Sequence, residues 1–123
     1  MDKRAIGRAP MGLPFSLGVL AGDTFYLSGA IGFDERTNGV IPGGIEAETR
    51  KAMEHLERVL REAGMDLTHV VKVTVYLADM NDFPIFNRVY GGYFSDHLPA
   101  RETVAVKGLA LGARVEMSFV AVR

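Results

Sequence analysis

The chain has 123 residues, of which 14 are Lys or Arg and 15 are Asp or Glu, so its formal net charge is -1. This length predicts a single domain over residues 1–123, with a sizeable core but little room for a deep pocket within one chain. The charge balance offers nothing to attract a nucleic-acid backbone, and no basic run compensates for it. The absence of cysteine excludes disulfides, thiol catalysis and thiolate metal sites.

Membrane and export signals are also missing from the sequence. No apolar stretch approaches the roughly 20 residues that are needed to span a bilayer. Residues 1–15 are interrupted by Gly and Pro and contain no continuous apolar segment of the kind found in signal peptides. We therefore expect a cytoplasmic protein without a membrane partner.

The first elements expected along the chain are a hairpin and a long helix. Residues 16–29 (SLGVLAGDTFYLSG) read as two strands with Gly22 at the turn. Residues 33–44 form a polar loop. Apolar residues at helical spacing then predict a helix over residues 45–63, and Gly64 is placed to end it.

Four further elements complete the chain. Residues 70–77 (VVKVTVYL) alternate, which predicts a strand with one apolar face formed by Val71, Val73, Val75 and Leu77. A second helix follows, capped by Asn81 or Asp82. Strands are expected over residues 101–106 and 114–122. The order β-β-α-β-α-β-β predicts an α+β fold with a mixed β-sheet and two helices packed on one face.

The sheet face that the helices leave open is expected to carry few charges. In the last strand its residues alternate with those of the helix-side face, and they are Arg114, Glu116, Ser118, Val120 and Val122. A sheet face exposed to water is usually more strongly charged than this. We therefore expect a second subunit to cover this face. A weakly charged but exposed amphipathic face is the alternative.

Familiar metal and hydrolase motifs are absent from the sequence. The histidines His55, His69 and His97 have no HxxxH spacing and no carboxylate at ligand spacing, so each is expected to be a surface or capping residue. Ser16 and Ser28 lack the GxSxG context of a hydrolase nucleophile. We expect neither a metal nor a cofactor.

Arg101 and Glu116 are the remaining candidates for chemistry. An arginine beside a buried carboxylate suits small carboxylic acids, because the guanidinium grips the carboxylate and the glutamate handles protons. Spacing alone also allows a structural ion pair or two separate surface charges. Glu116 lies in mid-strand on the face that we expect to be covered, where a carboxylate is costly unless it is paired or used.

Four segments together resemble the reactive-intermediate deaminase family, also known as Rid, YjgF-type or L-PSP endoribonuclease-like proteins. They are YLSGAIG (26–32), DMNDFPIFNRVYGGYF (79–94), PARETV (99–104) and VEMSFVAV (115–122). The resemblance implies a chorismate-mutase-like fold and a homotrimer with clefts between subunits. It also implies a cofactor-independent hydrolase of the 2-iminobutanoate/2-iminopropanoate deaminase type. Such an enzyme converts small reactive 2-imino acids, derived for example from 2-aminoacrylate, to 2-oxo acids and ammonia.

The resemblance assigns roles to individual residues. Arg101 would bind the substrate carboxylate, and Glu116 would position the attacking water and manage its protons. The substrate-binding positions that it implies are Arg101, Thr103, Gly29, Ser28, Asn87 and Phe15. The chain departs from the family pattern at Phe15, Ala30, Gly32, Ala110 and Ser118, which leaves the preferred substrate side chain open. The alternative function is a non-catalytic 2-oxo acid-binding regulatory trimer. An RNA-acting role, proposed for family members, is disfavoured by the net charge.

Overall fold

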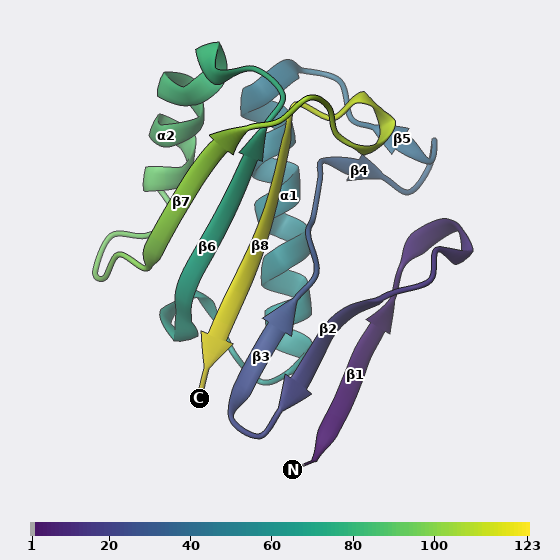
Figure 1. Cartoon of the computed structure of the whole chain (residues 1–123), viewed down its shortest axis with the longest axis vertical. Coiled ribbons are helices and arrows are strands. Elements are labelled where there is room, and N and C mark those ends of the chain that lie inside the picture. The colour runs from purple at the N-terminus through teal and green to yellow at the C-terminus, as the bar shows by residue number, and fades with distance from the viewer. Residues whose placement is uncertain (1) are drawn as a thin grey trace.

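The computed structural model describes residues 2–123 and contains one six-stranded sheet (Figure 1). Its strands lie in the order β1 (Lys3–Arg8), β2 (Ser16–Ala21), β3 (Thr24–Leu27), β8 (Val115–Val122), β6 (Val70–Leu77) and β7 (Ala100–Ala105). Neighbouring strands are antiparallel except β6 and β7, which are parallel. The sheet is therefore mixed, as predicted.

Both helices, α1 (Gly44–Glu62) and α2 (Phe83–Gly91), lie on the same face of this sheet (Figure 1). The apolar stripe of α1 is buried against the sheet and comprises Ile45, Ala52, Met53, Leu56, Val59 and Leu60. The helix ends as predicted at Gly64, whose φ is 73°. The Gly64 N–H donates to Arg61 O, and the Met65 N–H donates to Leu60 O, which satisfies two carbonyls of the last turn. The predicted α+β layering is confirmed.

The beginning of α2 differs from the prediction. Asp82 occupies the N-cap position, but its side chain does not cap the helix. Instead its buried carboxylate accepts two bonds from the Arg114 guanidinium, each 3.0 Å long. The Arg114 backbone N–H donates to Glu48 Oε1 of α1 at 2.8 Å. This cluster ties α1, α2 and β8 together.

Several short elements were not predicted. Strand β1 pairs with β2 at the edge of the sheet, although only Ile6 of its six residues is buried. The predicted polar loop contains a small hairpin of β4 (Phe33–Asp34) and β5 (Gly39–Val40). Four short 3-10 turns are η1 (Pro10–Gly12), η2 (Leu67–His69), η3 (Met80–Asp82) and η4 (Ala110–Gly112).

The predicted apolar face of β6 is wrong at one residue. Val71 is 49% exposed, whereas Val70 is buried. The pairing of β6 with β8 shifts register between Val70 and Lys72. An extra residue at such a bulge turns the next side chain to the other face of the sheet, so alternation cannot be extended through it. None of the helices in residues 2–123 is long and apolar enough to cross a membrane.

Candidate functional site

Arg101 lies on the helix side of the sheet. It stands opposite Val73 of the neighbouring parallel strand β6, and Val73 is fully buried beneath the helices. The Arg101 guanidinium carbon lies over three aromatic rings of α2, at 5.8 Å from the centroid of Phe83, 5.5 Å from that of Phe86 and 4.9 Å from that of Tyr90. Each such contact stabilises a cation by about 0.5–1 kcal/mol at an exposed site and by more where water is excluded. The rings therefore hold the guanidinium in place.

Polar groups without partners lie beside Arg101. Thr103 stands opposite Val75 of β6 and so shares the helix-side face with Arg101. Within residues 2–123 no hydrogen-bond partner is found for three buried oxygens, Thr103 Oγ1, Asn87 Oδ1 and the Tyr90 hydroxyl. Buried polar atoms are normally satisfied, so a cluster of unsatisfied ones is typical of a ligand site. We call Asn87, Tyr90, Arg101 and Thr103 the helix-side group.

Glu116 lies on the opposite face of the sheet. It stands opposite Tyr76 of β6, and the two residues beside it, Val115 and Met117, are fully buried on the helix side. Its carboxylate lies directly over Gly29, where a Cβ atom would collide with Glu116 Oε2. Burial raises the pKa of the Glu116 carboxyl above its ordinary value. Gly29 is thus required for the observed position of this carboxylate.

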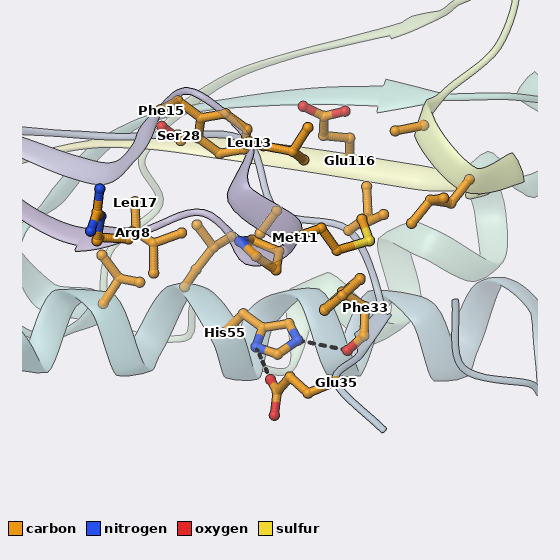
Figure 2. Close-up of a pocket in the computed structure, with 18 of the residues that line it drawn as sticks. Arg8, Met11, Leu13, Phe15, Leu17, Ser28, Phe33, Glu35, His55 and Glu116 are labelled. Carbon is orange, nitrogen blue, oxygen red and sulfur yellow. Dashed lines mark hydrogen bonds and ion pairs between the residues drawn. The ribbon is translucent and has the colours of Figure 1, made fainter. Parts of the chain in front are cut away.

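Glu116 borders a cavity of about 690 Å³. Phe15, Ser28 and Gly29 line the cavity together with Glu116, and we call these four residues the outer-face group. Figure 2 shows residues that line the cavity: Glu116 stands on β8, His55 stands on α1, and Met11 lies between the two in this view. The Ser28 hydroxyl already donates to Ser16 O at 2.6 Å.

The structure therefore divides the predicted site residues into two groups on opposite faces of one sheet. Arg101 and Glu116 form no ion pair with each other, so a structural salt bridge between them is excluded in this chain. They also cannot face one pocket within a single chain. A site that uses both groups needs a second chain.

Of the two histidines His55 and His69, only His69 has its expected role. His55 was expected at the surface or as a cap, but it is buried, with Nε2 2.9 Å from Phe33 O and Nδ1 3.8 Å from Glu35 Oε1 (Figure 2). His69 does act as a cap, because its Nδ1 accepts from the Asp66 N–H. The aromatic residues of α2 around Arg101 were not predicted as part of the site. Their helical spacing, in the helix that precedes the strand of Arg101, was the available signal.

Comparisons with known proteins show what the chain is similar to. Residues 7–123 match the family model described as Endoribonuclease L-PSP. The 2-iminobutanoate/2-iminopropanoate deaminase of Rattus norvegicus is 43% identical over 109 residues, which cover 89% of this chain and 80% of the rat protein. The mouse protein of the same name is 42% identical over 117 residues, which cover 94% of this chain and 87% of the mouse protein. Among solved structures, YyfA of the Rid protein family from Yersinia pestis superposes with a TM-score of 0.92 at 31% identity, covering 99% of this chain and 100% of that one.

Proposed function

Because the chain belongs to the Endoribonuclease L-PSP family, which includes the Rid and YjgF proteins, we propose that it is a deaminase that hydrolyses 2-imino acids to 2-oxo acids and ammonia. The names of the rat and mouse relatives, both above 40% identity over most of the chain, support this activity. The observation that carries the proposal is the position of the Glu116 carboxylate, which lies half-buried over Gly29. Burial raises the pKa of this carboxyl. A carboxylate whose pKa is raised is a stronger proton acceptor than an ordinary one.

Arg101 binds the substrate carboxylate in this proposal. A guanidinium offers two parallel N–H donors that match the two carboxylate oxygens, and the aromatic rings of α2 fix its plane. Asn87 and Thr103 supply further polar contacts, because each has a buried oxygen for which residues 2–123 provide no partner. Lysine would replace Arg101 poorly, since its ammonium cannot make the planar two-point contact.

Glu116 activates water. The imine carbon is already electrophilic, so an oriented water and a proton acceptor are sufficient for attack. Water forms a C–O bond to the carbon of the protonated imine while Glu116 accepts one water proton, which gives a neutral carbinolamine. Glu116 then returns this proton to the nitrogen. The C–N bond breaks as the carbinolamine hydroxyl gives its proton to Glu116, so ammonia and the 2-oxo acid leave, and Glu116 releases the proton to water or to ammonia. Every step uses groups of the chain, the substrate and water.

A cleft between subunits would bring the two groups together. The helix-side group of one chain would close over the outer-face group of a neighbour, in a homotrimer as the family resemblance implies. Exposed apolar side chains on the outer face support such an assembly, since Tyr26 is 53% exposed and Val104 is 45% exposed. The cytoplasmic location and the lack of a nucleic-acid partner stay predictions.

The activity can be tested with imines that are generated in place by an amino-acid oxidase. We expect the protein to accelerate 2-oxo acid release from 2-iminopropanoate and Arg101→Ala to abolish the acceleration. Arg50→Ala, which removes an exposed arginine of α1, is the matched control and should retain full activity. An unchanged rate with wild-type protein would contradict the proposal.

Glu116→Gln separates catalysis from the alternative of a regulatory 2-oxo acid-binding protein. A catalyst should lose most of its rate and keep much of its affinity for a 2-oxo acid, because Arg101 still grips the carboxylate. Binding by the wild-type protein without any turnover would instead favour the regulatory alternative.

A further inference from the structure

The cavity beside Glu116 is larger than a small imine requires. Its volume is about 690 Å³, within the range of pockets that hold drug-sized ligands. At the roughly 30 Å³ that a water molecule takes in the liquid, the six heavy atoms of 2-iminopropanoate would occupy on the order of 200 Å³. Most of the cavity would be left over once the reacting atoms were in place.

The remaining wall is mainly apolar. Near Glu116 and along the cavity it is formed by Met11, Leu13, Phe15, Ile31, Ala110 and Leu111. Several polar groups of the wall already have partners. The Ser28 hydroxyl donates to a backbone carbonyl, His55 bonds Phe33 O, and Glu35 lies 3.9 Å from Arg58. A substrate side chain that extends from the reacting carbon would therefore meet mostly carbon.

Two of these apolar residues have strained backbones. Met11 has φ 60° and Leu111 has φ 58°, although they come from opposite ends of the chain. Large side chains rarely adopt this left-handed region, and such strain tends to persist where it serves a function. Both side chains are 50% exposed and both line the same cavity. An apolar ligand in the cavity would bury the exposed parts of Met11 and Leu111.

We propose that this cavity binds the substrate side chain, and that the preferred substrates are 2-imino acids with long unbranched or branched apolar side chains. The inference rests on the proposed deaminase function and deepens it, since it names the substrate class of the same site. Burial of each additional methylene then raises kcat/KM about fourfold.

A series of imines tests this class directly. Imines would be generated from alanine, 2-aminobutyrate, norvaline and norleucine, with glutamine as a polar side chain of similar length. We expect kcat/KM to rise by about sixtyfold from the alanine to the norleucine imine, which has three more methylenes, and not to rise for the glutamine imine. A flat or falling series, with 2-iminopropanoate still hydrolysed, would overturn the inference and leave the deaminase function intact. No acceleration with any imine would overturn the function itself.

A variant that fills the cavity provides a second test of the proposal. Ala110 lines the cavity from an exposed position, so Ala110→Phe adds a ring there at little cost to the core. We expect it to lower kcat/KM for the norleucine imine about tenfold more than for the alanine imine. Ala78→Phe adds the same ring at an exposed residue outside the cavity and should leave this ratio unchanged. Equal losses for both imines in Ala110→Phe would contradict the assignment.

Discussion

At the scale of single residues, the position of Glu116 explains both its chemistry and its cost. The missing side chain of Gly29 lets the carboxylate settle where burial raises its pKa. A buried carboxylate destabilises the fold when it is ionised. The same burial makes it a better proton acceptor near neutral pH. Burial thus makes Glu116 a stronger base and lowers the stability of the fold.

A pH profile should report this pKa. The base must be ionised, so kcat/KM should fall as the pH drops through the raised pKa of Glu116, at a pH above the ordinary value of 4.5. Rates would be corrected for the uncatalysed hydrolysis at each pH. The residual rate of Glu116→Gln should show no such step. A wild-type profile that falls only below pH 4.5 would show that the carboxyl is not perturbed.

The raised pKa of Glu116 also makes the stability of the fold depend on pH. A carboxyl whose folded-state pKa is raised favours folding at low pH, and this contribution is lost as the pH rises through the folded-state pKa. Glutamine mimics the protonated form at every pH. Glu116→Gln should therefore have a higher Tm than the wild type at neutral pH and the same Tm below pH 4.5, as measured by thermal unfolding.

At the scale of elements, α2 acts as the support of Arg101. The side chain leaves β7 toward the helix because Arg101 stands opposite the buried Val73. Three rings of one helix face then hold the guanidinium, and Tyr90 lies nearest to it. The aromatic stripe serves the core and positions the arginine at the same time.

Replacing the nearest ring tests this support. Tyr90→Leu removes the ring, so Arg101 loses its fixed plane, and KM should rise roughly tenfold with a smaller change in kcat. Tyr90→Phe keeps the ring and should raise KM much less than Tyr90→Leu does. If both variants changed only stability, with KM unaffected, the ring would not position Arg101.

Periodicity was sufficient to predict most elements but not all. The hairpin of β2 and β3, both helices and the strands β6, β7 and β8 carry their own patterns of apolar residues. Strand β1 has no such pattern, since only Ile6 is buried, and its extended state results from pairing with β2. The bulge at Val71 depends on the register with β8, which a single strand does not encode.

At the scale of the whole molecule, the proposed function requires that one chain holds two incomplete halves of a site. The sequence identified Arg101 and Glu116 as candidates, and the family resemblance implied a cleft between subunits. Spacing could not reveal that the two side chains leave opposite faces of the sheet, because this depends on the registers in which β7 and β8 pair with β6. Arg101 stands opposite Val73, and Glu116 stands opposite Tyr76 on the other face. The outer face, where Tyr26 and Val104 are exposed, is where a neighbouring chain would dock.

Complementation between two inactive variants tests this account most directly. Arg101→Ala and Glu116→Gln chains would be unfolded, mixed in equal amounts and refolded together, and imine hydrolysis would be measured. If each cleft takes Arg101 from one chain and Glu116 from another, random assembly makes about a quarter of the clefts intact, and about a quarter of wild-type activity should return. Each variant refolded alone is the control. A mixture that assembles normally but shows no more activity than the two variants alone would contradict the account.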